Sequence, residues 1–577
     1  MIRFPTVWHA AGVAVLSAIL TACGTPNEGA ATAREDGAGV TIFANANVLT
    51  MDADTPRAQA LAVRDGLILA VGEREEVEAK FDAQARFRDL EGKTILPGFI
   101  DTHGHFAIGS STATMADLQP SPAGNVDDFE ALGAKLDDWY ADNAASPWIL
   151  GFGYDDSLLA ENRHPTRDDL DQISDEVPIL LIHVSAHFLT CNTPCLVAAG
   201  ITAETQDPAG GIIRRRAGSQ EPDGVLEETA MQLALARLPQ PTLDGAMRAM
   251  SANQAIYVRN GITTAQEGAG SPAQLAGIEA FAGSGALDID IVGYQVMRAV
   301  ADLDDERVVT DRTYSAHFRR GGIKLVLDGS PQGKTAWLTE PYHVVPSGNA
   351  EDYAGYATME TKDVNALVAA AFERDIQVIA HANGDAAADQ LLTATELANQ
   401  ANGVSDRRPV MIHAQTVRDD QLDKMKASGM IPSFFVAHTF FWGDWHRDSV
   451  LGAERAERIS PLRSALDRDM VLTIHNDSPV VPPDMMRLIW TAVNRKTRSG
   501  DVLGEAERIS AMEALEAITI DAAYQYFEED TKGSIEVGKR ADLTILSDDP
   551  TGVDPQEIAD ILVLETIKDG ATIYSRE

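Results

Sequence analysis

The sequence predicts an α/β protein with a (β/α)8 TIM-like barrel in the middle of the chain and a small β-sandwich domain built from its N- and C-terminal segments. Between residues 96 and 532, short apolar runs of β type alternate with amphipathic helical stretches, which is typical of a parallel sheet covered by helices. Clusters of short strand-like runs flank this region at 40–95 and 533–577. The 577 residues, 45% of them hydrophobic, are enough for more than one domain. A doubly wound sheet is the alternative, because strand counting alone does not exclude it.

The first 22 residues predict a signal peptide. Arg3 supplies a positive charge, and the apolar run at 10–20 is too short to span a bilayer. The segment from Leu20 to Cys23 resembles the lipobox of bacterial lipoproteins, in which the cysteine is lipidated and becomes the mature N-terminus. We therefore expect a lipid anchor on Cys23 at the periplasmic face of the bacterial cell envelope, with the outer membrane favoured because Gly24 follows. An ordinary cleaved signal peptide with a stray cysteine is the alternative.

The next residues predict a tether and the first part of the terminal domain. Residues 23–39 are rich in Gly, Ala, Thr and Glu, as expected of a flexible linker. In the strand-like run 60–72, Asp65-Gly66 between two apolar halves predicts a hairpin. The run 561–575, near the other end of the chain, contains a second such turn at Asp569-Gly570. We expect the two clusters to pair in one domain.

The composition limits the partners. A net charge of −40 and a pI near 4.6 argue against nucleic acid and anionic membrane surfaces, because both are polyanions. The expected partner is a small-molecule substrate, and a homo-oligomer is left open. Apart from Cys23, the chain has Cys191 and Cys195. An oxidising periplasm would permit a disulfide between them, and two unpaired buried thiols are at least as good an interpretation.

Nine apolar runs are candidates for barrel strands, and polar residues end several of them. The carboxyl ends of the strands carry the active site in a (β/α)8 barrel. The runs are 94–105, 177–188, 260–268, 290–297, 321–330, 375–385, 409–416, 431–438 and 470–479. The polar residues that end them include His103, His105, His381, His413, His438 and Asp477.

The first of these runs contains two histidines in the pattern HxH. His103 and His105 are two residues apart, so on a strand both side chains point to the same face and can reach one ion. His381 and His413 end consecutive runs, about one βα unit apart, and each could donate one nitrogen to a metal. For either of these two alone, a hydrogen-bonded core histidine is the alternative.

Lys324 lies inside an apolar run. Ile323, Leu325 and Leu327 alternate there and should face the helices, which turns Lys324 into the barrel. A buried lysine is unfavourable unless it is paired or used chemically. An ion pair with a neighbouring carboxylate is one interpretation. Reaction with CO₂ to give a carbamate that bridges two metals is the other.

Asp477 ends the last run. A carboxylate beside a metal-bound water can ligate the metal and accept the water's proton. His475, two residues earlier, is expected to be a structural neighbour or to support a ligand.

Together these motifs resemble the amidohydrolase superfamily. The opening LPGFIDTHGH is similar to its first-strand signature, and IKLVLDGSPQGKTA, IAHANGDAAAD, MIHAQ and IHNDSPV resemble the amidohydrolase family 3 branch. AHFLTCNTPCLVAAGI and GSIEVGKRADLTILSDDP carry the same likeness, which extends from about residue 40 to the C-terminus. The sequence departs from the pattern at His475-Asn476, where the family often has Gly-Ser before its aspartate.

The resemblance implies a metal-dependent hydrolase with one or two divalent ions, Zn²⁺ being the expected ion. Asp477 is the implied catalytic residue. Lys324 matches a lysine that is carbamylated in many members of the superfamily but not in all, so the resemblance leaves one metal or two open. We expect a metal-activated water to cleave a non-peptide C–N bond of amide type in a small molecule. An ester or lactone hydrolase on the same site, and a ligand-binding lipoprotein without catalysis, are the alternatives. The implied metal ligands are His103, His105, Lys324, His381, His413 and Asp477.

Two further histidines lie near the predicted barrel mouth. His187 and His438 are expected to contact the substrate or to hold an oxyanion, and a polar loop histidine is an equal alternative for each. The aromatic residues after His438 predict either a wall for an apolar substrate or a packed loop. They are Phe440, Phe441, Trp442 and Trp445.

Overall fold

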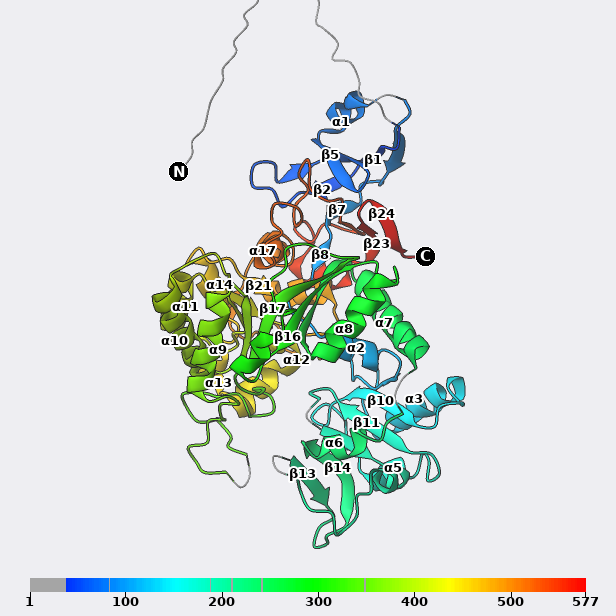
Figure 1. Ribbon diagram of the computed structural model, residues 1–577. Helices are drawn as coiled ribbons and strands as arrows, with labels where there is room; N and C mark the ends of the chain where they lie inside the picture. Colours follow the sequence, from blue (N-terminus) through cyan, green and yellow to red (C-terminus); the bar gives the residue numbers. More distant parts are fainter. Residues whose placement is uncertain (1–37, 82, 187, 209–210, 240–241, 347–348) are drawn as a thin grey trace, which may run out of the picture.

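The computed structural model describes residues 38–81, 83–186, 188–208, 211–239, 242–346 and 349–577. The predicted signal peptide, Cys23 and the tether up to residue 37 lie outside these residues. Within them, the strands form four sheets: one curled sheet in the centre, two sheets at the end where the termini of the body meet, and one sheet at the opposite end (Figure 1). No helix of the described part is long and apolar enough to cross a membrane.

The central sheet has eight strands, and every neighbouring pair is parallel. Eight of the nine predicted barrel runs supply its strands, so the predicted eight-stranded parallel sheet is confirmed. In sheet order from one edge, the strands are β8 (Phe99–Ile100), β15 (Ile262–Gly270), β16 (Asp290–Val296), β17 (Phe318–Val326), β18 (Val378–Ala382), β19 (Val410–His413), β20 (Ile431–Phe434) and β21 (Thr473–Ile474).

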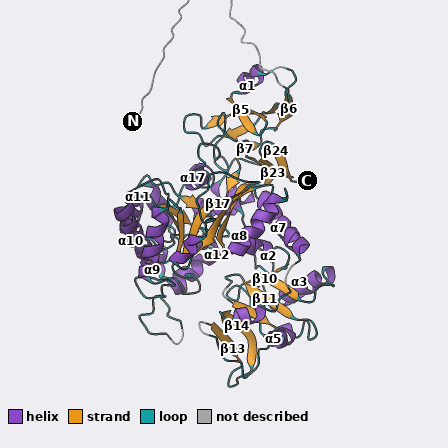
Figure 2. Ribbon diagram, viewed as in Figure 1, coloured by secondary structure: helices purple, strands orange, loops and turns teal. Residues whose placement is uncertain are grey.

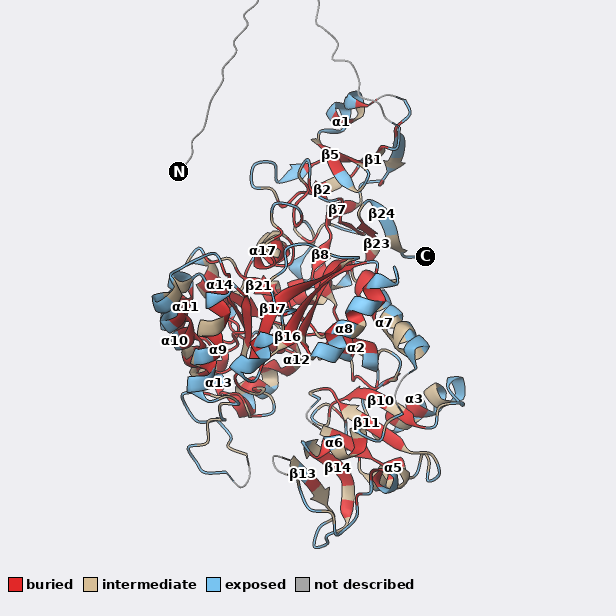
Figure 3. Ribbon diagram, viewed as in Figure 1, coloured by how far each residue is buried: buried red, intermediate tan, exposed pale blue. Residues whose placement is uncertain are grey.

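Helices cover the outer face of this curled sheet (Figure 2). Its strands are buried on both faces, whereas the helices expose their outer sides (Figure 3). Leu325 belongs to the cluster that packs the sheet against the helices, and Val292 and Ile379 belong to a separate cluster of buried residues. The long covering helices are α7 (Leu243–Val258), α8 (Pro272–Gly283), α9 (Thr361–Glu373), α10 (Asp385–Asn402), α11 (Asp419–Ser428) and α15 (Met485–Asn494).

Backbone contacts join the two edges of the curled sheet just beyond β8 and β21. The Asp477 N–H donates to the His103 carbonyl at 3.2 Å, and the His105 N–H donates to the Ser478 carbonyl at 2.7 Å. Gly104 and Ser478 form a parallel bridge. The first and last strands of the sheet therefore meet at the predicted site residues.

One of the nine predicted barrel runs, 177–188, was assigned wrongly. Residues 177–188 contain β11 (Ile179–His183), which pairs with strands of a separate six-stranded sheet. This sheet lies at the far end of the molecule from the termini of the body (Figure 1). Because β11 is apolar and buried in its own core, its sequence pattern resembles that of a barrel strand. The other strands are β9 (Ala116–Asp117), β10 (Ile149–Tyr154), β12 (Phe188–Cys191), β13 (Gly211–Arg215) and β14 (Pro222–Glu228).

Segments from both ends of the chain share a sheet, as expected. β7 (Thr94–Pro97) pairs with β22 (Leu543–Leu546), and β22 pairs with β23 (Val563–Lys568). A four-stranded sheet, built only from residues 41–89, shares a hydrophobic cluster with this six-stranded sheet. The term β-sandwich stays a prediction. The remaining strands are β1 (Thr41–Ala44), β2 (Asn47–Leu49), β3 (Arg57–Ala58), β4 (Ala60–Arg64), β5 (Leu67–Gly72), β6 (Arg86–Asp89) and β24 (Ala571–Ser575).

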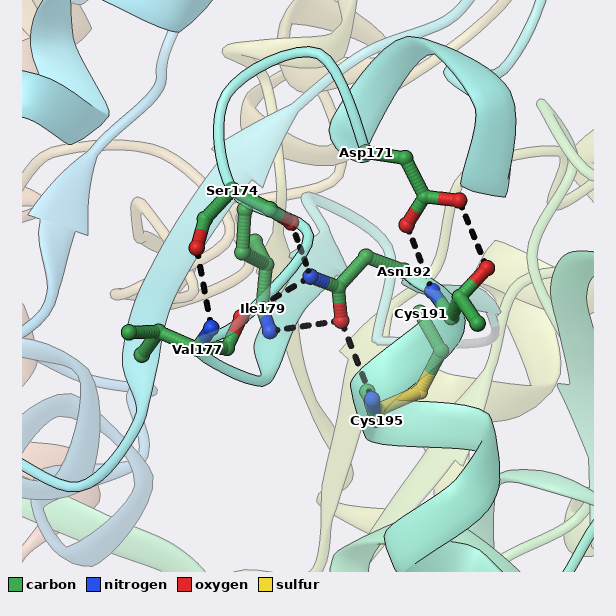
Figure 4. Close-up of a disulfide and its surroundings, with 8 residues drawn as sticks. Asp171, Ser174, Val177, Ile179, Cys191, Asn192 and Cys195 are labelled. Carbon is green, nitrogen blue, oxygen red and sulfur yellow. Dashed lines mark hydrogen bonds between the residues drawn. A yellow bond between two sulfur atoms is a disulfide. The ribbon is translucent and has the colours of Figure 1, made fainter.

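The two remaining cysteines are paired. Cys191 ends β12, and a disulfide joins it to Cys195 in α5 (Thr193–Ala199) (Figure 4). Asn192 caps this helix, because its side-chain oxygen accepts the Cys195 N–H and also the Ile179 N–H. The structure thus selects the disulfide between the two alternatives that the sequence left open.

Candidate metal centre

His103 follows β8 and is fully buried. Its Nδ1 lies 2.6 Å from Gln266 Oε1. The Gln266 amide nitrogen donates to the Thr102 carbonyl and lies 2.9 Å from the Tyr526 hydroxyl, so Oε1 is the acceptor toward His103. The His103 proton is therefore on Nδ1, and Nε2 carries a lone pair. Burial, with Lys324 beside it, lowers the pKa of His103 well below its ordinary value and keeps the ring neutral.

Lys324, on β17, points into the curled sheet as predicted. Its Nζ lies 3.1 Å from His103 Nε2 and donates to that lone pair. Burial lowers the pKa of Lys324 to about 7, although Asp477 and Glu267 act in the opposite direction. Within the part of the chain that the structure describes, Lys324 forms no ion pair, so the alternative of a paired lysine is not what the structure has.

His413 ends β19 and is held from behind by another histidine. Its Nδ1 lies 3.2 Å from His475 Nε2, and His475 Nδ1 lies 2.9 Å from Ser433 Oγ. His475 Nε2 can accept a hydrogen bond from His413 Nδ1–H, while His475 Nδ1–H donates a hydrogen bond to Ser433 Oγ. That arrangement leaves His413 Nε2 with a lone pair, and it gives His475 the supporting role that the sequence suggested.

His381, on β18, is oriented by Asp328. The His381 Nδ1 lies 3.0 Å from Asp328 Oδ1, so Nδ1 carries the proton and Nε2 is left as an acceptor. The carboxylate also accepts the backbone N–H groups of Trp337, Asn383 and Gly384. These donors hold Asp328 rigidly. The His381 ring meets the His413 ring at 4.5 Å between centroids.

Asp477 lies among the histidines. Its Oδ1 is 3.1 Å from His105 Nε2 and 3.6 Å from His103 Nε2, and its Oδ2 is 3.9 Å from His413 Nε2. Burial alone would raise the pKa of Asp477, but the nearby histidines outweigh burial and hold that pKa well below its ordinary value. The residue has φ of +54°, a conformation that is uncommon outside glycine and often marks functional sites.

The donor set fits a divalent metal ion. Two ligands of one ion, each about 2.1 Å from it in tetrahedral geometry, are about 3.4 Å apart. The His103 and His105 nitrogens lie at such distances from Asp477, and ligand atoms of His103, His413 and Asp477 all lie within 4.8 Å of one another. The buried Asp477 Oδ1 has no aligned hydrogen-bond donor among the described residues. An ion would satisfy it.

Four polar residues of this site, Gln266, Glu267, Asp101 and Tyr257, were not predicted from the sequence. Glu267, beside Gln266 on β15, is buried and accepts the Ala107 N–H at 2.6 Å, and its Oε1 lies 4.0 Å from His105 Nδ1. Asp101 and Tyr257 lie against Gly104, the residue between the two histidines. A Cβ on Gly104 would stand 2.7 Å from Asp101 Oδ2 and 3.2 Å from the Tyr257 hydroxyl. Glu267 and Gln266 were detectable, because they lie toward the carboxyl end of a predicted strand.

The two predicted substrate contacts, His187 and His438, have different outcomes. His187 lies outside the described residues. His438 begins α12 (His438–Trp445) and is buried, with its Nδ1 3.0 Å from His446 Nε2. Its ring packs on Phe435, whose other neighbours include His413. His438 is therefore next to the predicted metal ligands, without a hydrogen bond to any of them among the described residues.

A second group of metal-ligand type lies in the sheet of β9 to β14. His183 Nε2 is 3.1 Å from Asp156 Oδ1 and 3.9 Å from Asp155 Oδ1. The Ser185 N–H donates to His183 Nδ1, which places the His183 proton on Nε2, facing the carboxylates. A protonated Nε2 is not a metal ligand, so this group is a histidine held by acidic residues.

Comparison with known proteins agrees with this geometry. Residues 86–574 match the model of the amidohydrolase family. The N-substituted formamide deformylase of Arthrobacter pascens is 28% identical over 551 residues, covering 93% of this chain and 98% of the relative. Protein LONG AFTER FAR-RED 3 of Arabidopsis thaliana is 29% identical over 521 residues, covering 88% and 87%.

A solved structure shows the same fold. The uncharacterized metal-dependent hydrolase from Pyrococcus horikoshii OT3 superposes with a TM-score of 0.71 at 22% identity, covering 89% of this chain and 99% of that one. The family match spans most of the chain and includes every described residue of the metal centre. The chain therefore belongs to the amidohydrolase family and is a hydrolase.

Proposed function

We propose that this hydrolase cleaves a non-peptide C–N bond of amide type in a small molecule, with a divalent metal ion held by the histidine cluster. The observation that carries the proposal is the convergence of His103, His413 and Asp477, whose ligand atoms all lie within 4.8 Å of one another. The name of the Arthrobacter pascens relative, a deformylase of N-substituted formamides, supports a C–N bond as the target.

The metal ligands in this proposal are His103, His105, His381, His413 and Asp477, and Zn²⁺ suits such nitrogen and carboxylate donors. A bound divalent ion of this kind polarises a carbonyl group and makes water a stronger acid. We propose further that Lys324 carries a carbamate. Its amine is buried, unpaired with any described carboxylate and 3.1 Å from His103, where a carboxylate-like group would complete the donor set.

In this proposal Asp477 moves the proton. Its low pKa keeps the carboxylate ionised, so it can accept a proton from the attacking water. The same carboxyl then gives the proton to the leaving nitrogen. The buried walls around Asp477 exclude bulk water, and the neighbouring His438 is proposed to contact the substrate.

The test is hydrolysis by the metal-loaded protein of matched substrate pairs. Each pair has one acyl group, joined either to an amine or to the corresponding alcohol, and a lactone panel is added. Faster cleavage of the amides relative to the uncatalysed reaction supports the proposal, and cleavage of the esters or lactones alone transfers the site to the alternative reaction. A purified protein without a stoichiometric transition metal by elemental analysis would contradict the metal centre itself.

We also propose the lipid anchor on Cys23 that the sequence indicates, at the periplasmic face of the outer membrane. The disulfide supports an oxidising compartment, where such bonds persist. Metabolic labelling with a radioactive fatty acid in a bacterial host should label the full chain and leave Cys23→Ser unlabelled. Equal labelling of both would exclude Cys23 as the lipidated residue.

A further inference from the structure

His438 and His446 form a buried pair of histidines beside the metal centre. Both side chains are almost completely buried, and His438 Nδ1 lies 3.0 Å from His446 Nε2. The two rings are parallel to within 7°, and their centroids are 5.2 Å apart. This separation is close to the nitrogen-to-nitrogen distance plus the distance from each ring centre to its own nitrogen. The contact is therefore a hydrogen bond in the common plane of the rings, and not a face-to-face stack.

Both members of this pair are neutral. His446 begins the π-helical turn His446–Val450 that follows α12, and turns of this kind occur often at functional sites. Burial lowers the pKa of His446 to about 3. Burial, with His446 beside it, also lowers the pKa of His438 well below its ordinary value. Each ring therefore carries one proton, and the hydrogen bond between the rings uses only one of the two protons.

His438 is the member of the pair that lies nearer to the metal centre. It follows β20, which lies in the curled sheet between β19 and β21, the strands that lead to His413 and Asp477. The ring of Phe435 lies 4.4 Å from the His438 ring and 5.4 Å from the His475 ring, measured between centroids. Asp477 also acts on the pKa of His438, whereas burial alone shifts the pKa of its partner. Since His438 Nδ1 faces that partner, Nε2 is on the side of the ring toward the metal centre.

The second nitrogen of His446 determines which ring donates. His446 Nδ1 is buried, and no described atom forms a hydrogen bond with it. If His438 donated from Nδ1, His446 would carry its own proton on Nδ1, and that N–H would be buried without an acceptor. If His446 donates from Nε2, only a lone pair is left without a partner. Buried N–H groups without an acceptor are rarer than buried acceptors without a donor. His446 is therefore the donor, and the proton of His438 is on Nε2.

We propose that His446 is a positioning residue that fixes the tautomer of His438, so that His438 Nε2–H donates a hydrogen bond to the carbonyl oxygen of the substrate amide. Among the described residues, no group accepts a hydrogen bond from His438 Nε2. Negative charge develops on the carbonyl oxygen when water attacks, and a donor that is already in place stabilises that charge. A protonated Nε2 is not a metal ligand, so His438 stays outside the ligand set. This inference rests on the proposed function for its reaction and on the histidine pair for the tautomer.

The tautomer is tested without turnover. Nitrogen-15 NMR of the Zn²⁺-loaded protein, labelled at histidine, distinguishes a protonated ring nitrogen from one that carries a lone pair. The His438→Gln variant identifies the signals of His438. Wild type should show the His438 proton on Nε2, and His446→Leu should show a mixture of the two tautomers, because no donor then faces Nδ1. A proton on His438 Nδ1 in wild type overturns the inference, as does an unchanged His438 signal in His446→Leu.

Hydrolysis of the amides in the matched substrate pairs measures the consequence for catalysis. His438→Leu removes the donor, and kcat should fall about 10²- to 10³-fold, the range for loss of one such donor. His446→Leu removes the hydrogen bond that fixes the tautomer and should lower kcat about tenfold with little change in KM. His446→Gln places an amide N–H where Nε2 was and should recover most of this loss. Ser449→Ala, in the same π-helical turn, removes a hydroxyl that accepts from Lys334 and should leave kcat unchanged.

Equal losses in His446→Leu and His446→Gln overturn the inference, because His446 would then only fill space, and so does an equal loss in Ser449→Ala. Each variant should keep the zinc content of wild type. Loss of zinc in His446→Leu also overturns the inference, because His446 would then act through the metal. If His446→Leu fails to fold by circular dichroism, the wild-type NMR signals and His446→Gln decide. If the proton is on His438 Nε2 but no amide is cleaved, the proposed function fails while the tautomer assignment stands.

Discussion

The two ends of the curled sheet differ in how their buried charged groups are paired. At the amino ends of the strands, Asp290 begins β16 and ion-pairs with Lys532 and Lys568, the latter at 2.7 Å, while His317 Nδ1 lies 2.7 Å away. Lys568 forms a second ion pair, with Asp542 at 2.7 Å. These residues come from the sheet and from the C-terminal segment, so the network ties the two together.

At the carboxyl ends of the strands, the buried ionisable groups lie close together, but several of them lack an ion pair or a hydrogen-bond partner. Lys324 has no ion pair among the described residues, the buried Asp477 Oδ1 has no aligned donor, and both carboxylate oxygens of Asp101 are without a partner. Most of the charged groups at both ends are buried. Burial of charge alone therefore does not distinguish the two ends. The carboxyl ends differ because several buried ionisable groups without complete partners lie together there, where barrel enzymes carry their sites.

The largest expected effect is a loss of activity, at the carboxyl ends of the strands. Asp477→Asn keeps the shape of the side chain and removes its capacity to accept a proton, so kcat should fall by about 10²- to 10⁴-fold. The measurement is steady-state kinetics under saturating metal, with elemental analysis to show that the ion is retained. Activity within a few-fold of wild type would show that another group carries the proton.

At the amino ends of the strands, we expect a substitution to lower the stability of the protein and not its activity. Asp290→Asn leaves Lys532 and Lys568 buried with less counter-charge, and breaking such a buried pair costs about 3–5 kcal/mol. Urea unfolding measures this loss, and the metal content of the folded variant should equal that of wild type. A variant as stable as wild type would mean that the network does not hold the terminal segment in place.

Asp328 offers an intermediate case, because it lies behind a proposed ligand. Asp328→Asn removes the charge that orients His381, and loss of such a supporting carboxylate typically weakens metal binding about 10- to 100-fold. Competition with a chelator measures the affinity. Unchanged affinity, with unchanged stability, would remove His381 from the ligand set.

The smallest expected effect is the pH dependence of the stability that the Asp290 network contributes. Burial alone would raise the pKa of Asp290, but Lys532 and Lys568 outweigh it and lower that pKa well below its ordinary value. The resulting stabilisation is present above the pKa of an unfolded aspartate, about 3.9, and is lost as the pH falls from there toward the folded pKa. Wild type should therefore lose more stability than Asp290→Asn between about pH 5 and pH 3. Parallel pH curves for the two proteins would contradict this.

The position of a residue in a strand was enough to predict which side chains would be brought together. The strand ends that carry His103, Lys324, His381, His413 and Asp477 all lie in one sheet, because parallel strands bring their carboxyl ends to one edge. Lys324 was placed correctly by the alternation of its neighbours alone.

Prediction from the sequence failed where two sheets compete for similar strands. The run 177–188 has the apolar core of a barrel strand, and only tertiary pairing with β10 and β12 reveals that it belongs elsewhere. The pairing of Asp328 with His381 was also not predicted, for a different reason. Partners brought together from distant segments leave no local pattern in the sequence.

The contact between Asp477 and the His103 carbonyl has a consequence for folding. The backbone bonds that close the curled sheet are made by the same residues that form the metal centre, and they join positions near the two ends of the chain. Such non-local contacts carry a large loop-closure entropy and form slowly. Metal affinity should therefore report the completion of the fold. A nascent or truncated chain that ends before β21 would contain most of the ligands but would lack the strand edge against which the first two are held.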